Sequence, residues 1–146
     1  MPLNKQLIKK LVQSENMEQL ILELFDGKFK KQISQKDIYD VFKQKNYYMF
    51  PEFKDGKIVA MVSLYIMKLF SRKNAVIEEV VTLREFRNKG IGSKLVNLAI
   101  DKAKMLDCDC IELNVRHDNV GVKGFYEGLG FKDRNNDAMR MLLKSS

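Results

Sequence analysis

The apolar residues in the first part of the chain predict a short strand and then two amphipathic helices. The strand is expected over residues 5–12. The segment after it has apolar residues at the i, i+3, i+4 and i+7 spacing of one helical face, namely Met17, Leu20, Ile21 and Leu24. The next helix is expected to begin at Ser34, because Asp37 completes a capping box, and to end near Asn46.

A β pattern begins at residue 47. Residues 47–53 are rich in aromatic side chains, and Asp55-Gly56 is the kind of pair that closes a hairpin. Residues 58–67 are almost all apolar, so we expect this strand in the middle of a sheet. A further strand is expected over residues 75–83. The three strands are predicted to form an antiparallel meander.

The second half of the chain predicts a strand-helix-strand unit. A turn with two glycines at residues 87–92 precedes a long helix. The apolar face of this helix comprises Ile91, Leu95, Leu98, Ala99, Ala103 and Leu106. Another strand is expected over residues 110–115, after enough chain for a right-handed crossover that makes it parallel to the strand at 75–83.

The last part of the chain predicts a short helix over residues 120–127 and two strands over residues 131–134 and 139–143. A chain of 146 residues is long enough to bury one hydrophobic core. We therefore expect a single α+β domain, residues 1–146, with three layers around a mixed, mostly antiparallel sheet.

The composition is that of an ordinary globular chain. Apolar residues make up 45% and charged residues 31% of the sequence, which excludes a disordered chain, a collagen-like chain and a disulfide scaffold. The longest apolar run, residues 58–67, is too short to span a bilayer, and residues 1–10 lack the apolar core of a secretion signal. We expect a cytoplasmic protein without a membrane partner.

The chain is basic, with 26 lysines and arginines against 19 acidic residues and a formal net charge of +7. Such a charge favours an anionic partner, for example a phosphate-bearing cofactor, a nucleic acid or a membrane surface. The lysines are spread along the chain, and no recognition-helix or zinc-finger pattern accompanies them. A nucleic-acid partner is therefore not expected.

Two cysteines and one histidine lie close together in the sequence, as ligands of a metal site would. Cys108 and Cys110 lie two residues apart in a strand-like segment, where an extended backbone disfavours a disulfide, so reduced thiols are expected. Together with His117 they lack a fourth ligand and the usual spacing of zinc sites. No metal site is predicted.

The turn before the long helix has the features of a phosphate site. Backbone N–H groups at a helix N-terminus attract anions, and Gly90 and Gly92 have no side chain to obstruct them. A P-loop is excluded because Ser93-Lys94 has the reverse of the required order. A dinucleotide-binding fingerprint is excluded because Leu95 occupies the position of its third glycine.

The sequence RNKGIG, residues 87–92, instead fits the R/Q-x-x-G-x-G/A motif of the GNAT N-acetyltransferases. The surrounding sequence, IEEVVTLREFRNKGIGSKLVNLAIDKA, resembles that family throughout. Further along the chain, a second region resembles the family segment N-x-x-A-x-x-F-Y-E-x-x-G-F. It comprises IELNV, then Asn119 and then FYEGLGF, although Val122 replaces the usual alanine. The resemblance extends over residues 58–131.

The resemblance implies a three-layer α/β/α GNAT fold and a reaction in which the acetyl group of acetyl-CoA moves to a primary amine by direct attack in a ternary complex. In this family the glycine turn binds the pyrophosphate of acetyl-CoA, and strand backbone pairs with the pantetheine arm. The implied acetyl-CoA-binding residues are Val80, Val81, Thr82, Arg87, Asn88, Lys89, Gly90, Ile91, Gly92, Ser93, Asn119 and Tyr126.

The reaction needs a base, because an amine with an ordinary pKa is protonated at neutral pH. Glu78 and Glu79 are the candidates, and strand alternation predicts that they point to opposite faces of the sheet. Glu78 is preferred, because it stands four residues before Thr82, where the strand resembles family members with a glutamate. Glu79 is the second choice, and solvent or a base elsewhere is the alternative to both. A backbone N–H near Val81 is expected to polarise the thioester carbonyl.

Tyr126 matches the family's tyrosine near the thioester sulfur, where a phenol can donate a proton to the departing thiolate. Its neighbour Phe125 is expected only to pack. Asn119 is expected to cap the helix that follows it, to hydrogen-bond the pantetheine, or both. His117 is expected to be a loop residue and not the base.

The acceptor is expected to be a small-molecule amine, and the sequence leaves its identity open. The IEEVV run, the S-x-x-D helix before it and the CDCIEL strand after it resemble the glucosamine-6-phosphate N-acetyltransferases. Polyamines, amino acids, aminoglycoside-like amines, protein N-termini and lysines are the alternatives. A non-catalytic domain that binds or senses CoA is the alternative from another class. A homodimer is expected only because many members of the family dimerise.

Overall fold

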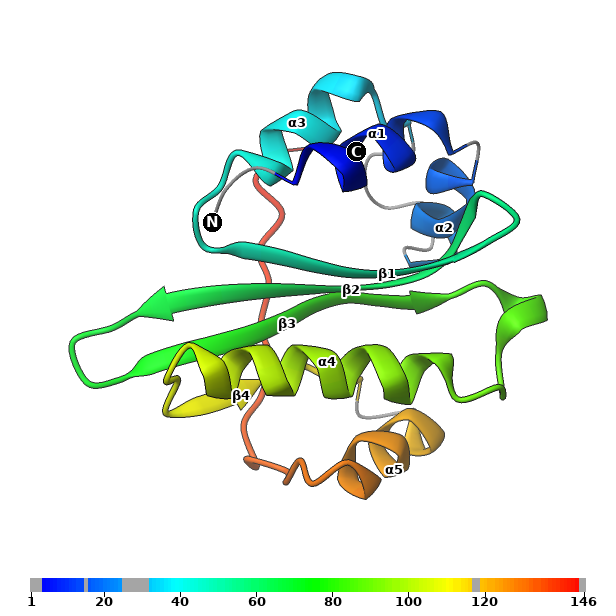
Figure 1. Ribbon diagram of the computed structural model, residues 1–146. Helices are drawn as coiled ribbons and strands as arrows, with labels where there is room; N and C mark the ends of the chain where they lie inside the picture. Colours follow the sequence, from blue (N-terminus) through cyan, green and yellow to red (C-terminus); the bar gives the residue numbers. More distant parts are fainter. Residues whose placement is uncertain (1–3, 15, 25–31, 117–118, 145–146) are drawn as a thin grey trace. The chain divides into compact units, whose positions relative to one another are not determined.

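The computed structural model describes residues 4–14, 16–24, 32–116 and 119–144. The chain divides into two compact units, Met1–Glu112 and Leu113–Ser146. The first unit contains, in order, α1 (Lys5–Gln13), α2 (Met17–Leu24), α3 (Gln35–Phe42), β1 (Tyr47–Lys54), β2 (Lys57–Lys68), β3 (Lys73–Thr82), the short 3-10 helix η1 (Arg84–Phe86), α4 (Ile91–Met105) and β4 (Cys110–Glu112) (Figure 1). The second unit contains α5 (Val120–Gly128). None of the helices in these described ranges is long and apolar enough to cross a membrane.

The first element is the helix α1, so the strand predicted for residues 5–12 was wrong. Ile8 and Leu11 are buried three residues apart on one helical face, whereas a strand would bury alternate residues. The helix also has a start signal, because the Asn4 side chain accepts a hydrogen bond from the backbone N–H of Leu7 at 3.0 Å.

The next two helices lie where the sequence predicted them. α2 buries Leu20 and Ile21. At the start of α3 the Ser34 hydroxyl accepts a hydrogen bond from the backbone N–H of Asp37 at 3.1 Å, and the Asp37 carboxylate accepts one from the backbone N–H of Ser34 at 2.8 Å. The predicted capping box is therefore confirmed. α3 ends at Phe42, earlier than predicted, because the chain turns there toward β1.

The strands form one sheet in the order β1-β2-β3-β4. The first three strands pair antiparallel, and β3 and β4 pair parallel after the crossover through α4. β2 lies inside the sheet, as its apolar sequence predicts. β4 has 3 residues and is shorter than the predicted strand at 110–115. A mixed, mostly antiparallel sheet with one parallel crossover is confirmed.

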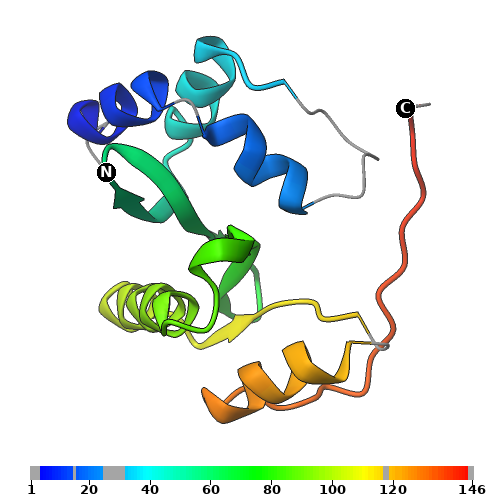
Figure 2. The ribbon, with the colours of Figure 1, turned by 90° about the vertical axis from the view of Figure 1, so that its right-hand side faces the viewer.

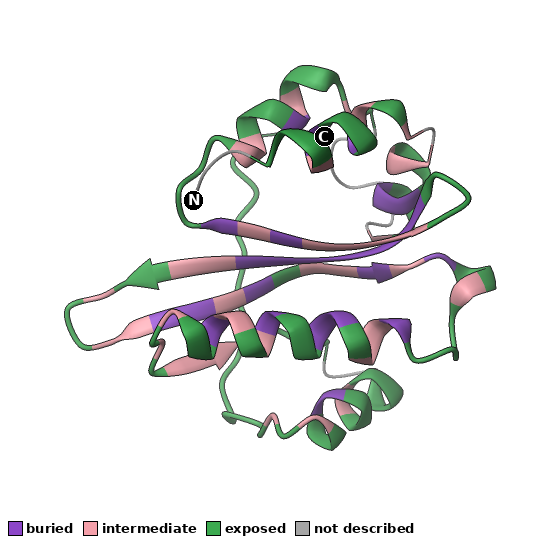
Figure 3. Cartoon of the chain, viewed as in Figure 1, coloured by how far each residue is buried: buried purple, intermediate pink, exposed green. Residues whose placement is uncertain are grey.

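Helices cover both faces of this sheet. α1, α2 and α3 lie on one face and α4 lies on the other in both views (Figures 1 and 2). Figure 3 shows that α4 has buried positions on the side that faces the strands. The three-layer α/β/α arrangement is confirmed in the first unit.

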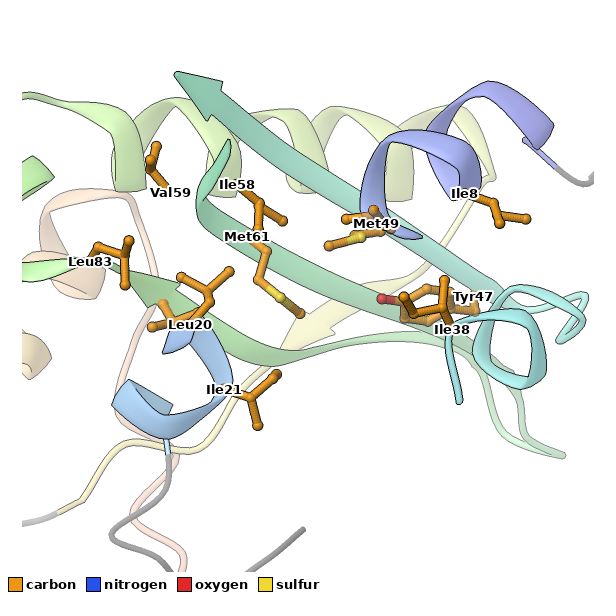
Figure 4. Close-up of a cluster of buried hydrophobic side chains, with 12 residues drawn as sticks. Ile8, Leu20, Ile21, Ile38, Tyr47, Met49, Ile58, Val59, Met61 and Leu83 are labelled. Carbon is orange, nitrogen blue, oxygen red and sulfur yellow. The ribbon is translucent and has the colours of Figure 1, made fainter. Parts of the chain in front are cut away.

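A buried apolar cluster joins α1, α2 and α3 to the sheet (Figure 4). Its buried members are Ile8, Leu11, Leu20, Ile21, Ile38, Tyr47, Met49, Ile58, Val59, Met61, Val81 and Leu83. Each aliphatic side chain that is fully buried stabilises the fold by roughly 1.5–3 kcal/mol. The cluster therefore fixes α2 and the end of β3, at Val81, against each other, which matters for the candidate site.

The second unit consists of α5 and the C-terminal segment. The predicted helix is present, and its predicted cap is confirmed, because the Asn119 side chain accepts a hydrogen bond from the backbone N–H of Val122 at 3.1 Å. The described part of this unit has no strand, so the strands predicted at 131–134 and 139–143 were wrong. An alternating sequence marks a segment that is able to pair, but a strand also needs a partner edge to pair with.

Candidate active site

An irregularity in β3 is the first notable feature of the site. Across the β2–β3 ladder Ser63 pairs with Glu78 and Met61 pairs with Val81, so the two residues Glu79 and Val80 stand opposite Val62 alone. Glu79 has a φ of 50°, in the left-handed region. This is a β-bulge, a feature that re-aims side chains and often lies next to active sites.

The bulge changes the direction of the two candidate bases. Directly opposed residues of an antiparallel pair have their side chains on the same face, so Glu78 lies on the Ser63 side of the sheet. The Glu79 carboxylate also reaches that side, because it accepts a hydrogen bond from the Ser63 hydroxyl at 3.2 Å. The expectation that the two glutamates point to opposite faces was therefore wrong, because the extra residue interrupts the alternation.

The two carboxylates differ in their surroundings. Glu78 is exposed, whereas Glu79 is half-buried. Burial raises the pKa of Glu79 above its ordinary value, the hydrogen bond from Ser63 opposes this rise, and the negative charge of Glu78 adds to it. Glu79 is thus better suited than an ordinary glutamate to accept a proton near neutral pH.

The β4 side of β3 is open over the bulge. Pairing between the two strands runs only from Asn74 to Val76 on β3, and within the described part of the first unit no strand pairs with β3 on that side from residue 77 onward. Val80, Val81 and Thr82, three of the expected acetyl-CoA-binding residues, lie on this stretch. Backbone groups at such an edge are available to pair with an extended ligand.

The glycine turn follows at the end of β3. The Arg87 guanidinium donates to the backbone carbonyl of Thr82 at 2.9 Å and to the Glu23 carboxylate of α2 at 3.1 Å, which fixes the start of the turn. Asn88 and Gly90 both have positive φ angles, 61° and 78°. The backbone is thus folded tightly enough to begin α4 directly after the turn.

The start of α4 has no side-chain cap. Gly90 is the N-cap residue and provides no side-chain hydrogen bond to the N–H groups of the first turn, which includes Ile91, Gly92 and Ser93. These N–H groups and the helix dipole favour an anion at this position. Lys89 lies over the Phe86 ring at 5.4 Å in the same turn. The residues expected to bind pyrophosphate, 87–93, are therefore brought together.

Tyr126, the expected acid, lies in the second unit. Its side chain is 7% exposed and packs edge-on against Phe125 and Phe131, with ring centroids 5.0 and 5.7 Å away. Burial raises the pKa of Tyr126 to about 12, so the phenol keeps its proton at neutral pH. Tyr126 also lines a hollow of about 520 Å³ within this unit, together with Asn114 and Lys123.

The other residues considered from the sequence have simpler outcomes. Asn119 is the N-cap of α5, which accounts for one of its two expected roles. His117 lies outside the described residues. Cys108 and Cys110 are free thiols, and Cys110 contacts the Asn74 side chain at 3.1 Å. In the described ranges no three His, Cys, Asp or Glu side chains gather as metal ligands would.

Sequence reasoning missed one polar residue of the site. Ser63 is 0% exposed and contacts both Glu79 and the Tyr47 phenol, at 3.2 and 2.8 Å. A single serine inside the apolar run IVAMVSLYIM was the available signal, because a buried hydroxyl needs a hydrogen-bond partner.

Comparison with known sequences decides the family. The sequence model of the acetyltransferase (GNAT) family matches residues 15–131. The chain belongs to the GNAT family. The family match includes β3, the glycine turn, α4 and Tyr126.

Two curated GNAT relatives match part of the chain. An uncharacterised N-acetyltransferase of Methanocaldococcus jannaschii is 36% identical over 83 residues, which make up 55% of this chain and 37% of that protein. Glucosamine 6-phosphate N-acetyltransferase of Arabidopsis thaliana is also 36% identical over 83 residues, which make up 55% of this chain and 54% of that protein. The chain thus spans about half the length of these relatives, or less.

Solved GNAT structures match nearly the whole chain. The Arabidopsis thaliana glucosamine-6-phosphate enzyme has a TM-score of 0.79 at 24% identity, and the match covers 94% of each chain. The aminoglycoside N-acetyltransferase AAC(6')-Iy, solved in complex with CoA, has a TM-score of 0.75 at 15% identity, and the match covers 97% of this chain and 91% of that chain. At these identities the matches show the GNAT fold.

Proposed function

We propose that the protein transfers the acetyl group of acetyl-CoA to a small-molecule primary amine, by direct attack within a ternary complex. The observation that carries the proposal is the arrangement in the first unit, where the open, bulged edge of β3 runs directly into an uncapped glycine turn. Membership in the GNAT family and the CoA complex of a protein with the same fold support it.

Acetyl-CoA supplies an activated acetyl group as a thioester. The N–H groups of Gly90, Ile91, Gly92 and Ser93 are suited to its pyrophosphate, with Arg87, Asn88 and Lys89 in the same turn. Backbone groups of Val80, Val81 and Thr82 are suited to pair with its pantetheine arm, and Asn119 is a second candidate contact for that arm. The basic chain, with a net charge of +7, suits an anionic cosubstrate.

Three steps of the chemistry are assigned to residues of this chain. Glu79 accepts a proton from the amine, either directly or through water, and Glu78 is the second candidate. A backbone N–H near Val81 polarises the thioester carbonyl as charge develops on its oxygen. Tyr126 donates its phenolic proton to the departing thiolate. We prefer Glu79 to Glu78, reversing the preference from sequence, because its burial raises its pKa toward the working range of a base.

The acceptor class is proposed from the relatives. Two of them are named for amino sugars or aminoglycosides, which are small molecules with primary amines. The surplus of positive charge favours an acceptor that bears phosphate, as glucosamine 6-phosphate does. We therefore place amino-sugar phosphates first among the amines to be tested. A CoA-binding domain without catalysis is the second candidate, and the occurrence of Tyr126 and two glutamates argues against it.

Calorimetric titration with acetyl-CoA tests the proposal, with acetyl-pantetheine as the control that lacks the pyrophosphate. Micromolar binding of acetyl-CoA, about −8 kcal/mol, and much weaker binding of the control are expected. An amine panel read by thiol release then follows, with glucosamine 6-phosphate, sisomicin, spermidine, lysine and a peptide with a free N-terminus. Absence of acetyl-CoA binding contradicts the proposal, and tight binding without turnover of any amine favours the non-catalytic alternative.

Replacing Gly92 by valine is expected to weaken acetyl-CoA binding by roughly 10- to 100-fold, because a β-branched side chain at the first turn of α4 obstructs the N–H groups assigned to the pyrophosphate. The dissociation constant is measured by calorimetry. Asn97→Val is the matched control, because Asn97 is exposed on the same helix and the variant has the same helix propensity. Equal affinity in both variants would contradict our placement of the pyrophosphate.

A further inference from the structure

Three side chains from three adjacent strands are joined by hydrogen bonds in the first unit. The Tyr47 hydroxyl on β1 lies 2.8 Å from the Ser63 hydroxyl on β2, and the Ser63 hydroxyl donates to the Glu79 carboxylate on β3 at 3.2 Å. Tyr47 and Ser63 are 5% and 0% exposed, so both hydroxyls lie in the apolar interior. Buried hydroxyls are costly unless they are hydrogen-bonded, so each of these groups depends on the next.

The chain of hydrogen bonds has one direction. A serine hydroxyl has a single proton, and Ser63 donates it to Glu79, which is a pure acceptor when it is ionised. The Ser63 oxygen can then only accept from Tyr47, so the phenol must be the donor of the first bond. Burial raises the pKa of Tyr47 above its ordinary value, which keeps its proton in place for this role.

The position of Tyr47 is itself fixed by packing. Its ring meets Phe42 of α3 edge-on at 5.5 Å and Tyr65 of β2 at 5.0 Å. The Tyr65 hydroxyl in turn accepts a hydrogen bond from the Gln44 side chain at 3.3 Å. The phenol that begins these hydrogen bonds is therefore held by ring contacts to α3 and β2.

We propose that Tyr47 and Ser63 are positioning residues for Glu79, which orient its carboxylate through this one-directional hydrogen-bond chain so that it can accept the proton of the amine. The inference rests on the proposed function, in which Glu79 is the base. The bulge is essential to it, because without the extra residue Glu79 would lie on the α4 side of the sheet, away from Ser63.

Titratable groups occur on β3 and on every element that packs against it. They comprise Lys73 and Glu78 on β3, Lys57, Tyr65 and Lys68 on β2, Cys110 and Glu112 on β4, Glu18 and Glu23 on α2, and Lys94, Asp101, Lys102 and Lys104 on α4. Glu23 is bound to Arg87, and Lys94 is bound to Glu52 at 2.7 Å. Glu78 is the charged group that acts on the pKa of Glu79, and it raises that pKa, as burial does.

Removal of either hydroxyl is expected to change the pKa of Glu79 in a predictable direction. The hydrogen bond from Ser63 stabilises the ionised carboxylate and so lowers the pKa of Glu79. In Ser63→Ala this bond is absent, so the pKa of Glu79 rises and the acidic limb of the kcat/KM profile moves to higher pH. We expect a loss of kcat/KM of roughly tenfold on the acidic side of the profile, and a smaller loss at its plateau. Tyr47→Phe is expected to move the limb in the same direction by less, because Ser63 keeps its own bond.

The experiment uses two readouts, one of which needs no acceptor. The first is titration of the Glu79 carboxyl by NMR in protein labelled with ¹³C at glutamate side chains, assigned by the loss of its signal in Glu79→Gln. The second is the pH profile of kcat/KM with the best amine of the panel. Ser71→Ala is the matched control, because Ser71 is an exposed serine of the β2–β3 hairpin. The melting temperature of each variant reports on any purely structural damage.

A double variant separates positioning from structure. If Ser63 acts through Glu79, adding Ser63→Ala to Glu79→Gln leaves kcat/KM unchanged relative to Glu79→Gln alone. An unchanged Glu79 titration in Ser63→Ala would overturn the inference. So would an activity loss that is equal at all pH values and persists in the Glu79→Gln background. The proposed function fails by a different result, namely no acetyl-CoA binding or no turnover of any amine of the panel, so the two failures are distinguishable.

Discussion

Replacing Tyr126 by phenylalanine is expected to lower kcat by roughly 10- to 1000-fold, with the affinity for acetyl-CoA almost unchanged. The substitution removes one hydroxyl and keeps the ring, so the edge-on packing against Phe125 and Phe131 is retained. The departing thiolate then has to take its proton from water. A lower kcat without a change in cosubstrate affinity is the signature of an interaction that is formed only in the transition state.

The protonation state of Tyr126 makes this prediction specific. Its pKa of about 12 means that the phenol is protonated at every pH of a normal assay, so the activity it supports should not decline between neutral pH and pH 10 on its account. Tyr39→Phe is the matched control, because Tyr39 is 43% exposed on α3 and the chemical change is the same. Steady-state kinetics and calorimetry measure the two quantities. Full activity in Tyr126→Phe would remove the phenol from the mechanism.

Replacing Glu79 by glutamine is expected to lower kcat/KM at neutral pH by roughly 100-fold or more and to move the profile toward alkaline pH. The variant has no carboxylate to accept the proton, so the amine reacts only as the pH approaches its own pKa. Glu78→Gln is the matched control and is expected to keep its activity at neutral pH, with the acidic limb moved slightly to lower pH, because Glu78 is exposed and its negative charge raises the pKa of Glu79. If Glu78→Gln moved the profile and Glu79→Gln did not, Glu78 would be supported as the base. Matching profiles for both variants would exclude both glutamates as the base.

Glu79→Gln is also expected to be more stable than the wild type at neutral pH. The folded-state pKa of Glu79 is raised above its unfolded value, so its favourable contribution is complete below the unfolded pKa and is lost as the pH rises through the folded one. Glutamine cannot ionise and does not lose this contribution. The difference in melting temperature should therefore be largest above neutral pH and should narrow in acid, which thermal unfolding at several pH values measures. This gain with loss of activity is the usual trade-off at a functional site.

Elements with a clear local pattern were predicted well from the sequence. The helix at α3 was predicted from its capping residues Ser34 and Asp37, and the central position of β2 from its continuous apolar run. α1 was misread, although Ile8 and Leu11 have helical spacing, because a short apolar segment fits both patterns. The final strands were misread for a different reason, since pairing depends on a partner that no local pattern specifies.

Most residues of the candidate site were predictable from the sequence, but their arrangement in space was not. The glycine turn and Tyr126 were assigned from motifs, and both lie in the expected elements. The bulge at Glu79 was not predictable, because it is defined by the register between β2 and β3 and not by either strand alone. The contact between Ser63 and Glu79 depends on that register, so the preference between the two glutamates changed. The roles of these residues and the single-domain organisation stay predictions.

The bulge in β3 also makes the direction of the Glu79 carboxylate sensitive to the loss of a single residue. Deletion of the Val80 codon would leave Glu79 directly opposite Val62 and so turn its carboxylate to the α4 side, while the turn at residues 87–92 would keep its sequence. A gene copy with that deletion would encode a protein that keeps the turn proposed to bind phosphate and loses the position of the proposed base. One in-frame deletion would therefore separate the two proposed parts of the site, the carboxylate on β3 and the turn before α4.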